Sequence, residues 1–402
     1  MPAAPVTTKY DLMLRGGWVI DPANGRDGPM DVAILGGKIA AVDREIRDVG
    51  ALKVVDVSGR YVTPGLIDLH AHFYGGGGGY KDFEMNPDMY AIPNGTTTVV
   101  DAGGAGWMNY GGFIDRVVHG YRTRVLGLLN ICAYGMHTHH ENDPKSFMPE
   151  ECARTICENS GVFVGIKTAH YMQPGYESVD AAVNAGEIAG VPVMMDSWPS
   201  DIRKYPDMIL KHLRPGDIHT HFYAQQFPWL GADKTVAPYM WQARKRGVIF
   251  DVGHGAGSFW FRIAAPAIAQ GFGPDTISTD AHSGSFYMQR ATMPVTISKL
   301  LCLGISLQEA IDRSTRVPAK VIRRTDIGTL SVGAEADVAV FELERALSPD
   351  TGFGYVDSGG AMMNGDKRLT CAMTIRAGNV LYDREGLSRP DYRGLGNYKK
   401  AE

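Results

Sequence analysis

The chain has 402 residues, of which 44% are apolar and 21% are charged, and its formal net charge at pH 7 is −4. This composition is typical of a folded protein with a sizeable core, and it excludes a disordered or collagen-like chain. The charge offers no basic surface for nucleic acid, and no apolar run reaches the roughly 20 residues that span a membrane. We therefore expect neither a nucleic-acid partner nor a membrane partner.

Both ends of the chain are rich in predicted strands. Apolar runs with glycine or proline turns lie at 11–22, 31–43 and 52–64, and similar runs lie at 333–343 and 369–383. We expect one small composite β-sandwich domain built from residues 1–62 and 326–402. No secretory signal is visible and no Cys-x-x-Cys pair occurs among the five cysteines, so we expect a reduced, cytoplasmic protein.

The middle of the chain alternates between buried strands and helices. Helical stretches at 178–190, 236–247 and 261–271 separate some of eight candidate strands, which lie at 66–72, 95–103, 124–132, 162–170, 191–197, 217–223, 247–255 and 276–282. This alternation predicts an α/β fold in which residues 63–325 form a (β/α)8 barrel of the TIM type. A doubly wound sheet is the alternative, but no Gly-x-Gly-x-x-Gly turn opens a helix.

Polar residues stand at the carboxyl ends of six of these strands, where a barrel places its active site. Each one alone is more simply a hydrogen-bonded core residue or a helix cap, but so many at one end favour a metal site. His70 and His72 are two residues apart, so both side chains point to the same face of a strand. The others are Lys167, Asp196, His221, His254 and Asp280. The histidine-rich segment 137–141 lies on a polar loop, and there we favour a solvated or substrate-facing role over a second metal site.

Several of these segments resemble motifs of the amidohydrolase superfamily. The segment from Tyr61 to His72, YVTPGLIDLHAH, resembles the first barrel strand of that family, and 328–341, GTLSVGAEADVAVF, resembles the return to its β-domain. The segments 164–167, 217–221, 251–255 and 277–280 are similar to the dihydroorotase-like amidohydrolase/deacetylase branch.

The resemblance implies two divalent metal ions, most simply zinc, with manganese or iron as alternatives. His70, His72 and Asp280 match the ligands of the more buried ion, and His221 matches a ligand of the exposed ion. Lys167 matches the lysine that carbon dioxide converts to N6-carboxylysine, which bridges the two ions. Such a pair of ions lowers the pKa of a water toward neutrality. Asp280 matches the group that shuttles the proton, so we expect it to be the catalytic acid and base.

One ligand position departs from the family pattern. The family has a histidine at the end of strand five, whereas this chain has Asp196, which we expect to ligate the exposed ion. His219, two residues before His221, is an alternative ligand, although we favour a hydrogen-bonded role for it inside the barrel. For substrate contacts we expect His254, Tyr74 and Trp198.

The expected function is hydrolysis of an amide or ester bond of a small acylated substrate by a metal-activated hydroxide, as in deacetylases and esterases. Ring opening of a cyclic amide, as in dihydroorotase or hydantoinase, is one alternative, and an arginine for the carboxylate of dihydroorotate could come from Arg122, Arg262 or Arg290. A non-catalytic barrel with a role in assembly is the other, which the full set of ligands argues against. From the superfamily we also expect a homo-oligomer.

Overall fold

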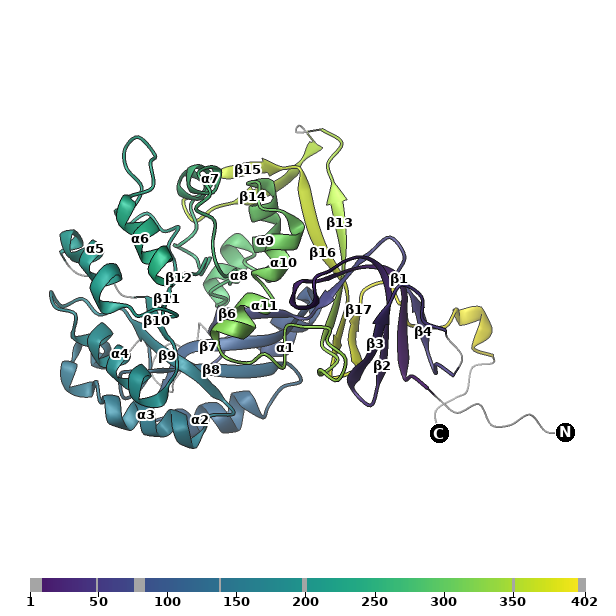
Figure 1. Cartoon of the computed structure of the whole chain (residues 1–402), viewed down its shortest axis with the longest axis horizontal. Helices are drawn as coiled ribbons and strands as arrows, with labels where there is room; N and C mark the ends of the chain where they lie inside the picture. The colour runs from purple at the N-terminus through teal and green to yellow at the C-terminus, as the bar shows by residue number, and fades with distance from the viewer. Residues whose placement is uncertain are drawn as a thin grey trace.

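The computed structural model describes residues 9–47, 50–75, 84–136, 139–196, 201–348 and 351–396. Its larger part is a parallel, curled sheet of seven strands in sequence order, with helices on the outside (Figure 1). The strands are β6 (Leu66–Ala71), β7 (Thr96–Gly106), β8 (Arg124–Asn130), β9 (Phe163–Ala169), β10 (Val193–Asp196), β11 (Ile218–His219) and β12 (Ile249–Phe250). The predicted strands at 66–72 through 247–255 therefore all contribute to this sheet.

The eighth predicted strand does not form a regular strand, but its residues lie between the two edges of the sheet. The segment 276–281 makes isolated parallel bridges from Thr276 to Asp251 and from Ala281 to Ala71. Two further hydrogen bonds reach it, from the Val252 amide to the Thr276 carbonyl and from the His72 amide to the Ala281 carbonyl. The segment thus links β12 to β6.

The helices around this sheet follow the predicted alternation. The three helical stretches read from the sequence correspond to α4, α6 and α7. The helices are α1 (Pro87–Ala91), α2 (Tyr110–Phe113), α3 (Pro149–Glu158), α4 (Glu177–Ala189), α5 (Tyr205–Asp207), α6 (Pro238–Arg246), α7 (Phe261–Ala269), α8 (Ser283–Gln289), α9 (Met293–Cys302), α10 (Leu307–Asp312) and α11 (Arg316–Val321). None of the helices in the described ranges has the length and apolar character needed to cross a membrane.

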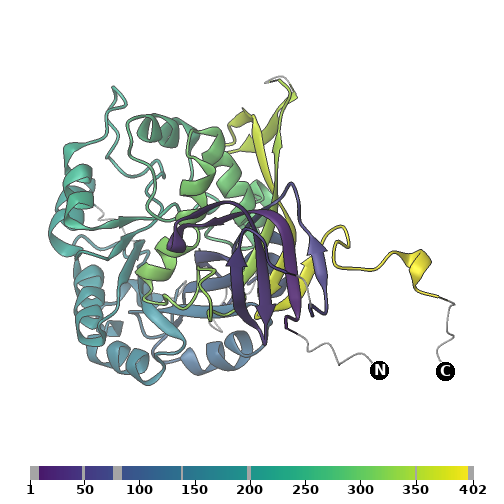
Figure 2. The ribbon, with the colours of Figure 1, turned by 45° about the vertical axis from the view of Figure 1, so that its right-hand side comes forward.

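Strands from both ends of the chain pair in a second sheet of eight strands, drawn in purple and yellow-green in Figure 2. Its order is β17-β16-β13-β5-β1-β2-β3, with β4 paired to β1. The strands are β1 (Leu12–Asp21), β2 (Arg26–Leu35), β3 (Lys38–Asp43), β4 (Val54–Asp56), β5 (Tyr61–Pro64), β13 (Val338–Arg345), β16 (Lys367–Arg376) and β17 (Asn379–Asp383). The composite origin of this sheet agrees with the sequence, whereas its arrangement as a sandwich stays a prediction.

A short hairpin between β13 and β16 has no counterpart in the predicted elements. It consists of β14 (Phe353–Val356) and β15 (Met362–Gly365), which pair with each other in a two-stranded sheet. Figure 1 shows it beside α7 and α9, on the barrel side of the molecule.

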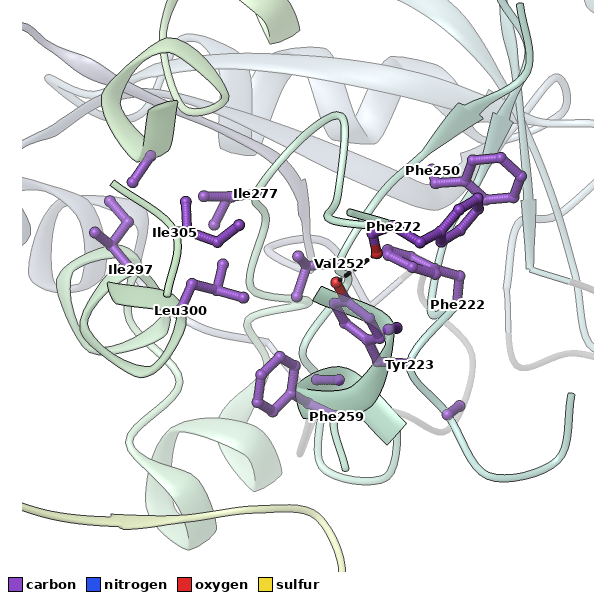
Figure 3. Packing of buried hydrophobic residues seen from close by; sticks show 14 of the residues in the cluster. Phe222, Tyr223, Phe250, Val252, Phe259, Phe272, Ile277, Ile297, Leu300 and Ile305 are labelled. Carbon is purple, nitrogen blue, oxygen red and sulfur yellow. Dashed lines mark hydrogen bonds between the residues drawn. The ribbon is translucent and has the colours of Figure 1, made fainter. Parts of the chain in front are cut away.

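Large aromatic side chains fill the core on one side of the barrel. Phe222, Tyr223, Phe250, Phe259 and Phe272 are fully buried and pack together, and the Tyr223 hydroxyl donates to the Phe272 carbonyl at 3.4 Å (Figure 3). Burying such rings contributes much of the stability of a core. This cluster supports the segments that follow β11 and β12.

The two large sheets are joined by a buried ion pair at the amino-terminal end of β8. Arg124 Nη1 lies 2.6 Å from Asp337 Oδ2 and donates at 2.7 Å to the Thr98 hydroxyl on β7. Asp337 precedes β13, and its other oxygen accepts from the Ala377 amide at 2.9 Å. Because only 9% of the Arg124 side chain and 4% of the Asp337 side chain are exposed, neither charge has water as a substitute partner.

We expect Arg124→Ala to destabilise the protein strongly without affecting chemistry at the other end of the strands. Removing one partner of a buried ion pair leaves the other charge uncompensated, which costs about 3–5 kcal/mol. The midpoint of denaturant unfolding should therefore fall. Arg393→Ala is the control, because Arg393 pairs with Asp391 where both side chains are exposed, and it should leave the midpoint unchanged. Equal midpoints for the two variants would contradict a structural role for the Arg124–Asp337 pair.

Candidate active site

Six residues singled out in the sequence converge at the carboxyl ends of the barrel strands. Parallel pairing aligns Lys167 on β9 with Met194 on β10, so Asp196, two residues further on, faces the same side. Lys167 Nζ lies 3.2 Å from Asp196 Oδ2 and 2.9 Å from His70 Nε2. The Lys167 side chain has no exposed surface, so its amine sits in the middle of the cluster.

Asp280 and His221 complete the cluster from the other side. Asp280 Oδ1 lies 2.9 Å from His72 Nε2 and 3.5 Å from His70 Nε2. His221 Nε2 lies 3.3 Å from Asp196 Oδ2 and 3.9 Å from Asp280 Oδ2. One ligand atom each from His70, His221 and Asp280 falls within 4.8 Å of the others, a spacing that a single metal ion can bridge.

The charges in this cluster balance one another. Burial opposes ionisation of Asp196, but His221 and Lys167 outweigh it and hold the pKa of Asp196 well below its ordinary value. Burial likewise opposes ionisation of Asp280, but the three neighbouring imidazoles lower its pKa. Burial would lower the pKa of His221, but the carboxylates of Asp196 and Asp280 raise it to about 9. The two buried carboxylates are therefore ionised, and the protein supplies their counter-charges.

The backbone is held in an uncommon conformation at two of these residues. His221 and Asp280 have φ angles of 59° and 46°, in the left-handed region that side chains other than glycine rarely adopt. Such strain persists only where the surrounding structure imposes it, and it gathers at functional sites. Gly255 packs against the same place, because a Cβ there would lie 2.3 Å from Asp280 Oδ2.

Hydrogen bonds behind the cluster fix which ring nitrogens face it. The Thr220 hydroxyl donates to Asp251 Oδ2 at 2.8 Å, so at 2.9 Å it must accept from His70 Nδ1. His221 Nδ1 lies 2.6 Å from the Gly253 carbonyl, which can only accept. Both imidazoles thus carry a proton on Nδ1 and turn Nε2 toward the cluster, as metal-binding histidines do.

The cluster opens into a cavity of about 230 Å³. Its lining includes two histidines, His170 and His282, that were not singled out in the sequence. His170 follows β9 and its Nδ1 lies 3.3 Å from Glu141 Oε1, while His282 caps α8 through its ring nitrogen. The lining consists of His72, Met136, His170, Asp196, His221, Gln226, Ala256, Gly257, Ser258, Asp280 and His282. His282 could have been noticed, because Asp280-Ala-His282 repeats the spacing of His70-Ala-His72.

Of the residues expected to contact substrate, Tyr74 and His254 are not part of the described lining of this cavity. Tyr74 is buried against Phe113, and its hydroxyl donates to the Asn109 carbonyl at 3.2 Å. His254 is fully buried and turns away from the cavity, with its ring stacked on Phe259 at 4.9 Å. Neither lines the described part of the cavity, so their contact with substrate stays a prediction, and Trp198 lies outside the described residues.

His219 has the hydrogen-bonded role favoured for it. Its Nδ1 lies 2.7 Å from the Thr220 carbonyl and its Nε2 is bonded to the Tyr205 hydroxyl. Burial lowers the pKa of His219 to about 4, so the ring is neutral. With both nitrogens engaged, His219 does not face the cluster.

Comparisons with known proteins agree with this geometry. No family model matches the chain. It is 32% identical over 326 residues to a deacetylase of Agrobacterium fabrum, a match that covers 79% of each protein. Crystal structures of an adenine deaminase and a dihydroorotase superpose with TM-scores of 0.83 and 0.79 at 28% and 27% identity. These matches cover 93% and 92% of this chain and 100% and 99% of the two structures.

The chain belongs to the amidohydrolase superfamily. It is therefore an enzyme that acts on C–N bonds, and its structural neighbours share the barrel part of the fold expected from the sequence. This amidohydrolase has a candidate metal site at the place where the sequence predicts one.

We expect Thr220→Val to weaken metal binding without unfolding this amidohydrolase. Valine has the size of threonine but cannot accept from His70 Nδ1, and loss of such a supporting bond typically costs about 10- to 100-fold in metal affinity. Competition with a chelator measures the dissociation constant. Thr374→Val is the control, because Thr374 is as buried but bonds to the Ile92 carbonyl, away from the site. An unchanged metal affinity in Thr220→Val would show that Thr220 does not orient His70.

Proposed function

We propose that this amidohydrolase is a metal-dependent hydrolase that cleaves the amide or ester bond of a small acylated substrate, as a deacetylase does. The observation that carries the proposal is the buried Lys167 amine, which lies within 3.2 Å of Asp196 and 2.9 Å of His70 in a cluster of imidazoles and carboxylates. A cluster of this kind has no evident role in packing, and it opens directly into a cavity.

The donor set suits divalent ions. Imidazole nitrogens and carboxylate oxygens are the ligands that zinc, manganese and iron bind in proteins. His70, His72 and Asp280 would hold the more buried ion, and His221, whose ligand atom lies close to those of His70 and Asp280, would hold the exposed ion. Asp196, which contacts both His221 and Lys167, is the proposed ligand that distinguishes a second position. We propose two ions, with zinc as the first choice.

Lys167 would take part as N6-carboxylysine. A free amine has a reference pKa near ~10.4 and would repel metal ions as a cation. The ammonium first loses a proton, and the neutral amine then forms a bond to the carbon of carbon dioxide and releases a second proton, which leaves an anionic carbamate with two oxygens. Lys167 Nζ contacts a residue of each proposed position, His70 and Asp196, and this supports the proposal that its carbamate would supply a ligand to both ions.

The chemistry divides between the ions and the protein. When bound, divalent ions lower the pKa of water and polarise a carbonyl group. Asp280 is ionised and lines the cavity, so it can take a proton from the attacking water and return it to the leaving nitrogen or oxygen. His72, 2.9 Å from Asp280 Oδ1, orients this carboxylate.

The cavity favours a small acyl group over a dihydroorotate-like ring. The described part of its lining contains no arginine or lysine to pair with a ring carboxylate. Arg262 instead bonds to Gln225 and stacks on Trp260, and Arg290 lines a different groove. Arg122 lies before β8, at the opposite end of the strands. Similarity to a deacetylase supports the same choice.

Other features remain proposals that accompany this function. They are the division into a β-sandwich domain of residues 1–62 and 326–402 and a barrel of residues 63–325, assembly as a homo-oligomer, and a location in the cytoplasm.

A substrate screen tests the proposed function. The protein is loaded with zinc, manganese or iron in bicarbonate buffer and offered N-acyl amino acids, acyl esters and cyclic ureides. We expect turnover of acylated amides or esters that disappears on chelation. Turnover of cyclic ureides alone would replace the proposal by ring opening, and turnover that survives metal removal would refute the metal-dependent mechanism.

We expect Asp196→Ala to lower the bound metal from about two ions per chain toward one, because losing a direct ligand weakens one position selectively. Mass spectrometry of metal content measures this. Asp196→His is the matched variant, since it restores the imidazole that the family has there, and it should retain two ions. If Asp196→Ala keeps the parent stoichiometry, or if the parent binds a single ion, Asp196 is not the ligand of a second ion.

We expect Asp280→Asn to lower kcat by at least about 100-fold, because the amide cannot accept the proton and general acid–base steps are worth that much. Circular dichroism should show an intact fold, since asparagine has the same shape. Near-normal turnover in this variant would remove Asp280 from the proton transfer.

A further inference from the structure

The segment that follows β12 contributes directly to the candidate active site. We call residues 253–261 the β12 loop. Its Gly253 carbonyl accepts from His221 Nδ1 at 2.6 Å, and its Gly255 packs against Asp280 Oδ2 so closely that no side chain fits between them. Residues 256–258 line the cavity. The position of this loop therefore decides where His221 and Asp280 point.

His254 in this loop faces away from the cavity and into the protein. Its Nδ1 lies 2.9 Å from the Gly255 carbonyl, so that nitrogen must donate. Its Nε2 consequently has a lone pair, and at 2.7 Å it accepts from Lys299 Nζ. His254 is thus a neutral link between the loop backbone and Lys299 on α9.

Lys299 is an unusual residue at this place in the core. Only 1% of its surface is exposed, and its neighbours Ile297 and Leu300 on α9 are fully buried (Figure 3). Burial lowers the pKa of Lys299 to about 7, against the attraction of Asp357. A methionine or leucine would fill the same volume without the cost of desolvating an amine. Packing therefore does not explain the lysine.

The second bond of Lys299 reaches the hairpin of β14 and β15. Lys299 Nζ donates to the carbonyl of Val356, the last residue of β14, at 2.7 Å. The amine therefore joins the β12 loop, α9 and the hairpin, three segments far apart in the sequence.

The hairpin also bonds directly to the β12 loop. Ser358 Oγ accepts from the Phe259 amide at 3.0 Å, and the Ser358 amide donates to the Phe259 carbonyl at 2.9 Å. Asp357 Oδ2 accepts from the Phe261 amide at 3.0 Å. Figure 1 shows the hairpin reaching from the eight-stranded sheet to α7 and α9. The β14–β15 hairpin is thus hydrogen-bonded to the β12 loop at the active site.

We propose that Lys299 is a positioning residue, through which the β14–β15 hairpin holds the β12 loop in the shape that presents His221 and Asp280 to the metal site. The metal part of this inference rests on the proposed function. The hairpin is the fixed support, and Lys299 connects it to the loop by donating a hydrogen bond to His254. His254 in turn bonds to the Gly255 carbonyl, and the loop backbone contacts the two site residues, His221 and Asp280.

Lys299→Met tests the role directly, because methionine keeps the length and packing but removes both donated bonds. We expect a melting temperature equal to or above that of the parent, because no amine is buried. We also expect faster amide hydrogen exchange in the β12 loop, metal affinity reduced about 10-fold, and a lower kcat with little change in KM. Lys320→Met is the matched control, since Lys320 is exposed on α11, and it should change none of these.

The outcomes separate this inference from the proposed function. Parent-like metal affinity in Lys299→Met, or unchanged exchange in the β12 loop, overturns the positioning role. If Lys299→Met does not fold, Ser358→Ala replaces it, because it removes the bond to the Phe259 amide, and it should raise loop exchange and weaken metal binding in the same direction. If the parent protein binds no metal, the proposed function fails, and loop exchange alone then decides whether Lys299 holds the loop.

Discussion

Asp196 and Asp280 are buried carboxylates that need counter-charges or hydrogen-bond donors, and the residues around them at the carboxyl ends of the barrel strands provide these. An ionised carboxylate away from water is costly unless cations or hydrogen-bond donors surround it. Lys167, His70, His72 and His221 meet this requirement from three different strand ends. Each strand must therefore end at the correct level, and the parallel sheet provides that alignment because all of its carboxyl ends open on one side.

A second set of carboxylates keeps those strand ends in place. Asp251 accepts from the hydroxyls of Thr220, Thr276 and Ser278 and so fixes the hydroxyl that orients His70. Asp68 accepts from the Thr279 amide next to Asp280, and Asp101 accepts from the Phe73 amide next to His72. Burial raises the pKa of all three, to about 6 for Asp68. Asp251, Asp68 and Asp101 thus hold the polar strand ends in position, and none of the three is part of the described cavity lining.

The sequence predicted the seven regular barrel strands and the gathering of polar residues at their ends, because apolar runs form buried strands and the carboxyl ends of parallel strands open on one side. The eighth predicted strand forms only isolated bridges. The sequence did not predict that the His254 ring faces away from the cavity, because the left-handed glycines Gly253 and Gly255 break the alternation of side chains along the strand. It also failed for the hairpin at 353–365, whose short strands are only partly buried. Their role depends on Lys299, a contact more than fifty residues distant along the chain.

Asp196, at the end of β10, would affect the relative stability of the protein without and with bound metal. Asp196 is the counter-charge of both Lys167 and His221 in the structure, at 3.2 Å and 3.3 Å. A histidine there would remove the carboxylate that Lys167 and His221 both contact. Asp196 therefore stabilises the cluster, and an ion held at the proposed second position would have to replace this ion pair. The same carboxylate is also a harder ligand than imidazole, which shifts preference toward ions that favour oxygen. An aspartate in place of the family's histidine would thus lower the affinity of the second position for metal and widen the range of metal ions that this position can bind.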